Sequence, residues 1–478
     1  LWLGALRAEF WRRQREKRET RQASRQNGVP WGSFLAVLGL VIVLPTLIDW
    51  GLAMRWPHLV TALHYFVSTV YAITALMIVW EACAARRDAA PDACDGAALP
   101  PLPRCTAIVA AYLPNEQDII LETVTHMLSK VGGATADFEM ILAYNTPERL
   151  PIEDVLAAVA DRDPRLRLLR VEGSRSKAEN INAALEEARG EIVGVYDADH
   201  APHADCFHRA WRWLGQGYDM VQGRCVIRNG GDNWLTRLIA VEFDSIYALS
   251  HQGRSRLSRT AIFGGSNGYW RLQSLRSAGM NPAMLTEDID SSVRSLLAGR
   301  KLAHDRSIIS EELAPMQARH WLFQRKRWAQ GWFEVTLCHL RGLMQTPHLN
   351  PLQKFFWFYL LAWREMYPFL ALQVFPLMLT AALRGQSIYW FGNWYFLATS
   401  VITLASGPLM IALTFLWAGP RRMRARKRWY FSYVVLSLFY TVAKTLITLV
   451  AQLSHVIRDR TWVTTPRASP PPPSDPAS

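Results

Sequence analysis

The sequence predicts an α/β domain with a Rossmann-like sheet, attached to an α-helical transmembrane region with amphipathic interface helices. Half of the 478 residues are hydrophobic and 20 are Trp, which is too apolar for an ordinary soluble enzyme. Several stretches are long enough to cross the roughly 30 Å hydrocarbon core of a bilayer. Between them, short apolar runs alternate with helical patterns, as in a parallel sheet covered by helices.

Near the start, residues 34–54 and 59–80 form two apolar stretches joined by a short polar connection. We interpret residues 34–80 as a transmembrane hairpin. Residues 1–33 form a basic tail before it, and a full-length span after so long a tail is an anchor rather than a cleaved signal peptide. By the positive-inside rule, this tail is expected in the cytoplasm.

The chain carries a formal net charge of +13. Its basic residues concentrate beside apolar stretches, as at residues 12–25 and 421–428, so contact with anionic lipid explains the charge more simply than nucleic-acid binding. The six Cys show no paired C-x-x-C spacing. Neither a disulfide framework nor a zinc site is therefore predicted.

Residues 81–103, rich in Ala, Pro and Asp, are expected to link the hairpin to a catalytic domain at residues 104–345. Four apolar runs in this domain predict strands, and the patterns between them predict helices. The strands are expected at residues 106–112, 138–144, 166–171 and 191–197, and the helices at residues 115–128, 153–159 and 178–188. Ligands of such sheets bind beyond the carboxyl ends of the strands, which is where the polar motifs of this chain fall.

Two amphipathic helices are predicted later in the domain, at residues 234–249 and 317–343. The second is rich in both Trp and Arg, and helices of this kind commonly lie in the membrane interface. Packing on the core of the domain explains the same pattern equally well.

A second membrane region is predicted at residues 353–457. Residues 355–383, which contain an Arg-Glu pair, and residues 388–417 are expected to span the bilayer. Residues 429–457 are apolar but include a Lys, so they form either a fifth span or an interfacial helix. Residues 458–478 end in a Pro-rich, low-complexity run.

Two motifs near the predicted strand ends could bind a metal and phosphates. Asp197 and Asp199 follow an apolar strand, and paired carboxylates suit hard cations such as Mg²⁺ or Mn²⁺. Taken alone, the pair is more often a polar loop that ends a strand. Lys177 begins a predicted helix, where phosphate binding and a solvated helix start are the alternatives.

Two later motifs could bind and activate an acceptor. Asp288, preceded by Glu287, stands at the start of an amphipathic helix, where it is either an N-cap or a general base. Gln324, Arg327 and Trp328 share one face of the Trp-rich helix. That face offers a guanidinium for phosphate and an indole for a sugar ring, although a Trp/Arg anchor in the membrane interface has the same composition.

In this order, and flanked by apolar spans, these motifs resemble the membrane-embedded inverting glycosyltransferases of family 2, which include cellulose, hyaluronan and β-glucan synthases. The segment Phe263, Gly264, Gly265 and Ser266 resembles the acceptor-lining segment of that family. The resemblance covers about residues 105–343 and the layout of the spans. It implies a GT-A fold for the catalytic domain.

The resemblance also implies roles for individual residues. Asp199 and Asp197 would hold Mg²⁺ or Mn²⁺ against the UDP diphosphate, and Asp288, beside Glu287, would take the proton of the acceptor hydroxyl. The nucleotide-binding residues would be Tyr112, Glu116, Asn145, Lys177, Asp197, Gln324 and Arg327; the acceptor-binding residues would be Trp328, Gly264, Gly265 and Ser266; and a gating segment would include Thr464, Thr465 and Arg467. This segment must be cytoplasmic, which favours four full spans over five.

One position departs from the family pattern. Where the family usually has an Asp-Asp pair that contacts uracil, this chain has Asn145 followed by Thr146 and Pro147. Asn145 can keep a hydrogen bond to the base, and Tyr112 and Glu116 can supplement it. The sequence therefore defines the identity of the nucleotide less well than it defines the metal ligands and the general base.

The resemblance implies an inverting, UDP-sugar-dependent hexosyltransferase that polymerises a β-linked polysaccharide, with β-glucan from UDP-glucose as the first expectation, and exports it. Transfer of one sugar to a lipid or glycan acceptor is the rival, and an inactive membrane scaffold belongs to another class. The expected partners are a UDP-sugar, a growing polysaccharide and membrane lipids, but no nucleic acid; an oligomer or an accessory export subunit is compatible with this scheme. The expected location is the cell (inner) membrane, multi-pass, with the catalytic domain in the cytoplasm.

Overall fold

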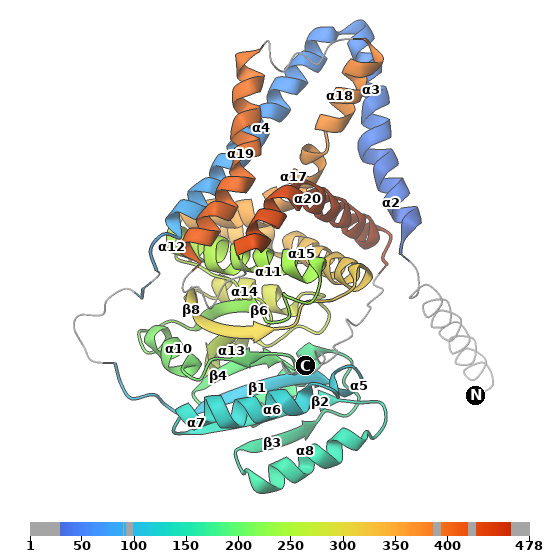
Figure 1. Ribbon diagram of the computed structural model, residues 1–478. Helices are drawn as coiled ribbons and strands as arrows, with labels where there is room; N and C mark the ends of the chain where they lie inside the picture. The colour runs from blue at the N-terminus through green and yellow to red at the C-terminus, as the bar shows by residue number, and fades with distance from the viewer. Residues whose placement is uncertain (1–28, 89, 92–98, 386–392, 419–426, 460–478) are drawn as a thin grey trace, which may run out of the picture.

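A computed structural model describes residues 29–88, 90–91, 99–385, 393–418 and 427–459. Within these residues one mixed sheet forms the base of the molecule, and long helices rise from one side of it (Figure 1). The expected α/β fold class with apolar helices is confirmed. The strands are β1 (Cys105–Tyr112), β2 (Phe138–Asn145), β3 (Leu166–Arg170), β4 (Ile192–Asp197), β5 (Ala201–Pro202), β6 (Met220–Ile227), β7 (Gly268–Arg271) and β8 (Leu302–Glu312).

The sheet order is β3-β2-β1-β4-β7-β6-β8-β5. The first four strands in this order are parallel, as the sequence predicts, but β7 runs antiparallel to both β4 and β6. Gly268 pairs with Val195, so β7 starts beside the carboxyl end of β4 and must run back along it. The four strands that the sequence predicts are parallel as expected, and β6 and β8 run in the same direction; only β7 and the short β5 run against the others.

Apolar side chains alternate between the two faces of the central strands. The helices of this domain are α5 (Leu113–Glu116), α6 (Ile120–His126), α7 (Gly132–Ala134), α8 (Pro151–Arg162), α9 (Lys177–Glu187), α10 (Cys206–Leu214), α13 (Leu272–Ala278) and α14 (Glu287–Leu297), with a π-helical turn η2 (Met127–Val131). Ile108 and Val195 pack with α9, α13 and α14, whereas Val109 and Tyr196 pack with α6, α8 and α10. The helix predicted at residues 115–128 is thus broken into α5, α6 and the start of η2.

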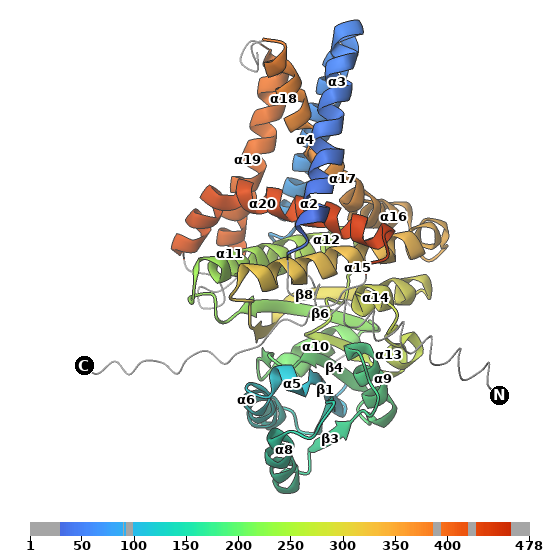
Figure 2. The ribbon, with the colours of Figure 1, turned by 90° about the vertical axis from the view of Figure 1, so that its right-hand side faces the viewer.

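The two predicted amphipathic helices lie between this sheet and the apolar helices (Figure 2). The first is longer than predicted, because α11 (Trp234–Phe243) continues through η3 (Asp244–His251) into α12 (Gln252–Ser258). The second is α15 (Ala318–Gln345). Its contacts with α14 bring it next to the sheet domain.

The apolar helices are α2 (Trp31–Leu38), η1 (Gly39–Val43), α3 (Leu44–Arg55), α4 (Pro57–Ala84), α16 (Pro351–Phe358), η4 (Tyr359–Trp363), α17 (Arg364–Ala371), α18 (Val374–Leu383), α19 (Trp394–Trp417) and α20 (Lys427–Val456). Among the described residues they form five helical stretches that are long and apolar enough to cross a membrane. The fifth, α20, differs in direction. It packs along α15, and its axis is steeply inclined to the axes of α4 and α19 (Figures 1 and 2).

Candidate active site

The predicted nucleotide-binding residues lie at the carboxyl edge of the parallel half of the sheet. Tyr112 at the end of β1 pairs with Asn145 at the end of β2, and Ala110 pairs with Asp197 at the end of β4. The Tyr112 N–H donates to Glu116 Oε2 at 2.8 Å. The structure therefore brings these side chains together at one edge, although they come from three separate strands.

Asn145 is already held by the protein. Its Nδ2 donates to the carbonyl of Ser174 at 3.1 Å, and its Oδ1 accepts a hydrogen bond from Asn180 Nδ2 at 2.8 Å. The buried Asn180 also donates to the carbonyl of Ala111 at 3.2 Å. Asn180 thus orients Asn145. The sequence shows Asn180 only as a polar residue near the start of a helix, so it did not predict this role.

Asp197 and Asp199 form a group with His200. Their potential ligand atoms lie within 4.8 Å of one another, and Asp199 is only 1% exposed. Asp199 Oδ2 accepts the N–H of Leu313 at 3.0 Å. Two carboxylates fit Mg²⁺ or Mn²⁺. Sequence reasoning missed His200, because one His in a loop is a weak signal.

The orientation of His200 comes from β8. Its Nδ1 lies 2.9 Å from Ser310 Oγ, and its Nε2 lies 2.8 Å from Glu312 Oε2. His200, Glu312 and Cys225 form a second group with ligand atoms within 4.8 Å, in which Glu312 is partly exposed. Because both ring nitrogens of His200 contact β8, Asp197 and Asp199 are the candidate ligands of the first group, and His200 lies beside them.

Lys177 connects the two halves of the site. Ser176 caps α9, because its Oγ accepts the N–H of Glu179 at 3.2 Å. The Lys177 ammonium forms an ion pair with Asp197 and donates to the carbonyl of Gly265 at 2.6 Å. Burial alone would lower the pKa of Lys177, but Asp197 and Glu287 outweigh it and raise that pKa, so the side chain is a cation.

Residues 263–266 cross between the loop of Asp197 and Asp199 and the helix that carries Asp288. The N–H of Asp197 donates to Ser266 Oγ at 3.1 Å, and the N–H of Phe263 donates to Ser292 Oγ at 2.7 Å. Gly265 has φ +86°, and a Cβ there would lie 2.7 Å from Asp288 Oδ2. Only glycine allows this backbone to approach the carboxylate so closely.

Asp288 has the properties of a general base. Its Oδ1 accepts the N–H of Ile289 at 2.9 Å, while Oδ2 faces Gly265. Burial, and then the neighbouring charge of Glu287, raise the pKa of Asp288 to about 7, although Lys177 and Arg327 act in the opposite direction. A carboxylate with this pKa accepts a proton more readily than an ordinary aspartate.

The helix α15 brings Arg327 near enough to Asp288 for its charge to act on that carboxylate. Gln324, Arg327 and Trp328 are partly exposed, whereas the intervening Arg325 is buried. Arg327 Nη1 donates to the carbonyl of Leu285 at 3.2 Å. Thr286 packs on Gly331, so α14 and α15 are in direct contact where the two motifs meet.

Three predicted gating residues, Thr464, Thr465 and Arg467, lie outside the described residues.

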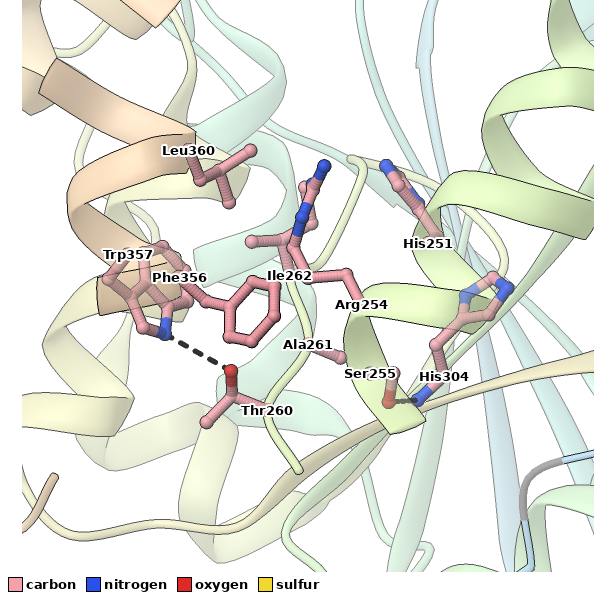
Figure 3. A pocket seen from close by; sticks show the side chains of 10 residues that line it. All are labelled: His251, Arg254, Ser255, Thr260, Ala261, Ile262, His304, Phe356, Trp357 and Leu360. Atoms are coloured by element: carbon pink, nitrogen blue, oxygen red, sulfur yellow. Dashed lines mark hydrogen bonds between the residues drawn. The ribbon is translucent and has the colours of Figure 1, made fainter. Parts of the chain in front are cut away.

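A cavity separate from the group of Asp197, Asp199 and His200 is lined by His304, Arg254 and the segment of residues 260–262, with Trp357 on its far side (Figure 3). Trp357 Nε1 donates to Thr260 Oγ1 at 3.1 Å. This contact fixes the start of the segment that continues into residues 263–266.

The chain is similar in sequence to known glycosyltransferases. The family described as "Glycosyl transferase family group 2" matches residues 192–465, and "Glycosyl transferase family 2" matches residues 106–276. A beta-monoglucosyldiacylglycerol synthase of a Synechocystis species is 26% identical over 302 residues, 61% of this chain and 62% of that protein. The chain thus spans about three fifths of that relative.

Other similar proteins match over shorter parts or with lower identity. A probable glycosyltransferase of Bacillus subtilis is 22% identical over 54% of this chain and 62% of that protein. An Arabidopsis thaliana glucomannan 4-beta-mannosyltransferase is 29% identical over 30% of this chain and 26% of its own length. A solved mannosyltransferase from Pyrobaculum calidifontis, in complex with GDP-Man and Mn²⁺, has a TM-score of 0.49 and 20% identity, covering 86% of this chain and 100% of that one.

Proposed function

This chain belongs to glycosyl transferase family group 2, and we propose that it is an inverting, cation-dependent enzyme. It transfers a hexose from a nucleotide-diphosphate sugar to an acceptor hydroxyl at a membrane. One observation carries the proposal. Gly265 touches both the proposed base, Asp288, and the proposed phosphate-binding Lys177, which is itself paired with Asp197. The base, the phosphate-binding cation and the metal group therefore surround one short segment.

These residues support a single-displacement reaction. The acceptor hydroxyl oxygen attacks the anomeric carbon of the donor, and Asp288 takes the proton of that hydroxyl. The bond from the anomeric carbon to the diphosphate breaks on the opposite face. The electron pair leaves with the diphosphate, where Lys177 and Arg327 supply positive charge. A divalent cation held by Asp197 and Asp199, with His200 beside them, would stabilise the same leaving group. Attack on the opposite face converts an α-linked donor into a β-linked product.

We propose UDP-glucose as the donor. Tyr112, Glu116 and Asn145 would contact the uracil ring of the nucleotide from the strand ends, with Asn180 holding Asn145 in place. Gln324 would join Arg327 at the diphosphate. The proposed gating residues of the C-terminal segment would close over the nucleotide.

For the acceptor, the first candidate is the end of a β-linked polysaccharide bound by Trp328 and residues 264–266, and exported between the apolar helices. The motif on α15 and the helices on both sides of the catalytic domain support a processive enzyme. A second candidate is a lipid hydroxyl, because the relative matched over 61% of this chain makes a glucosyldiacylglycerol. An inactive scaffold is disfavoured, since the base and metal residues occur together.

We further propose four membrane spans and a cytoplasmic catalytic domain at the inner membrane. The direction of α20, across α4 and α19, supports an interfacial position for that helix (Figure 2). Its outward face is apolar, with Phe431 and Phe439 each 72% exposed, while its inner face packs on α15. A helix of this kind fits the boundary between headgroups and acyl chains.

The deciding experiment uses the purified chain in phosphatidylcholine nanodiscs with Mg²⁺ or Mn²⁺ and a panel of UDP- and GDP-sugars. Release of nucleotide diphosphate identifies the donor, and digestion with linkage-specific glycanases identifies a polymer. Parallel nanodiscs containing dioleoylglycerol test the lipid acceptor, which would give a glycolipid instead. Failure to release nucleotide diphosphate from every donor would contradict the proposal.

A further inference from the structure

A buried group of charges lies between α11, α15 and α20. Glu242 on α11 is 2% exposed, and Arg325 on α15 is 7% exposed. Arg325 Nη2 donates to Glu242 Oε2 at 2.7 Å, and from α20 Tyr440 donates to the same oxygen at 2.7 Å. Lys444, also on α20, lies 2.5 Å from Glu242 Oε1. One carboxylate therefore joins three helices that are distant in sequence.

The same Arg325 lies against the proposed acceptor-binding indole. Its guanidinium carbon is 4.5 Å from the ring centroid of Trp328, and 5.8 Å from that of Phe243. A guanidinium over an indole stabilises the ring position, more strongly when both are shielded from water. Because Glu242 holds the guanidinium, it also determines where the face of Trp328 can lie.

Glu242 remains charged in this setting. Burial would raise its pKa, but Arg325 and Lys444 outweigh burial and lower the pKa to about 2. Removing the negative charge would leave two cations facing each other, which is costly in a buried place. The contact with Trp328 therefore depends on this single carboxylate.

We propose that Glu242 is a positioning residue for the acceptor: through Arg325 it holds Trp328, and through Tyr440 and Lys444 it links that indole to α20. The inference rests on the acceptor role proposed above for Trp328. A purely structural anchor would make a different prediction, because it would destabilise the protein without acting through Trp328.

A neighbouring carboxylate provides a matched control. Asp244 is buried, accepts from Arg224 Nη2 at 2.6 Å and accepts from Tyr430 of α20 at 2.6 Å. It thus anchors α20 to the catalytic domain through Arg224, whereas Glu242 does so through Arg325. Asp244→Asn is expected to weaken the α20 contact and leave the KM for the acceptor unchanged within about twofold.

The test is a double-mutant cycle of Glu242→Gln and Trp328→Ala in the full chain, with cellotetraose and dioleoylglycerol as acceptor probes. Glu242→Gln is expected to raise the acceptor KM about tenfold, with kcat within about twofold, and to have little further effect when Trp328 is already Ala. Arg325→Lys keeps the charge but loses the planar fork, so it is expected to raise the acceptor KM with little change in thermal stability.

The same cycle is read as shifts in the thermal unfolding midpoint, which requires no turnover. Midpoint shifts of Glu242→Gln and Trp328→Ala that do not add are expected, because the two side chains share Arg325. Additive effects on both the KM and the midpoint, or an acceptor KM raised equally by Asp244→Asn, would overturn the inference. If the wild type transfers sugar to neither probe, the proposed function is what fails, and the midpoint cycle still decides whether Glu242 acts on Trp328.

Discussion

The site has two sides that are built differently. The proposed donor side comprises the ends of β1, β2 and β4 with the start of α9, and Gln324 and Arg327 of α15 join it at the diphosphate. The proposed acceptor side comprises residues 263–266, α14 and Trp328 of α15. On the donor side, register and strand direction bring the strand ends together, and α9 adds Asn180 and Lys177. On the acceptor side, close backbone contacts at Gly265 and Gly331 and buried charges at Glu242 determine the geometry. The acceptor side is therefore the one that distant substitutions can disturb.

The largest effect is expected where the two sides meet, at Asp288→Asn. The amide cannot accept the acceptor proton, so kcat should fall about a thousandfold. Donor binding depends on the other side and should change little. The measurement is nucleotide diphosphate release with acceptor present, together with donor affinity by calorimetry. Activity within tenfold of the wild type would contradict the role of Asp288.

On the donor side, removal of divalent cations is expected to lower turnover about a hundredfold or more, because charge on the leaving diphosphate is then less well stabilised. Asp199→Asn should mimic this loss and weaken Mn²⁺ binding, since Asp199 is buried within the metal group. Titration of Mn²⁺ followed by electron paramagnetic resonance measures the binding directly. Unchanged Mn²⁺ affinity in Asp199→Asn would rule out this metal site.

The pH dependence separates the two sides further. Asp288 must be a carboxylate to act as a base, and its pKa is raised to about 7. Below that pH the protonated fraction grows, so kcat/KM should fall about tenfold for each unit and level off above it. Lys177 stays charged across this range, because its pKa is raised. A flat profile from pH 5.5 to 7.5 would contradict a base with this pKa.

The sequence predicted the donor side better than the acceptor side, for physical reasons. Strand ends, such as Asp197, are visible as breaks in apolar runs, and their meeting at one edge follows from parallel pairing. The sequence did not predict β7. Its antiparallel direction follows from the path of residues 263–267, which bring the chain to the carboxyl end of β4 before β7 begins. Nothing in the sequence pairs Glu242 with Arg325, 83 residues away, and the structure buries both. His200 required the contact with β8 to become a candidate.

The smallest expected effect compares two glycines of α15. A Cβ at Gly331 would lie 2.4 Å from Thr286 Cγ2 and 2.9 Å from Thr286 Cβ, so Thr286 or α15 must shift. Gly331→Ala should therefore disturb the contact between α14, which carries Asp288, and α15, which carries Trp328, and lower kcat/KM about tenfold. At Gly342 a Cβ would meet Leu297 at 3.6 Å, an ordinary contact. Gly342→Ala should leave activity unchanged and stabilise the protein by up to about 1 kcal/mol, because Ala favours the helix.

Equal activity of these two variants would show that α15 tolerates displacement at Thr286, and that the acceptor side is as robust as the donor side. Loss of activity in Gly331→Ala alone, with donor affinity intact, would instead locate the sensitivity at the contact between α14 and α15. Both variants carry the same chemical change on the same helix, so helix propensity cannot account for a difference between them. The remaining variable is how closely the backbone of α15 approaches the residue before Glu287.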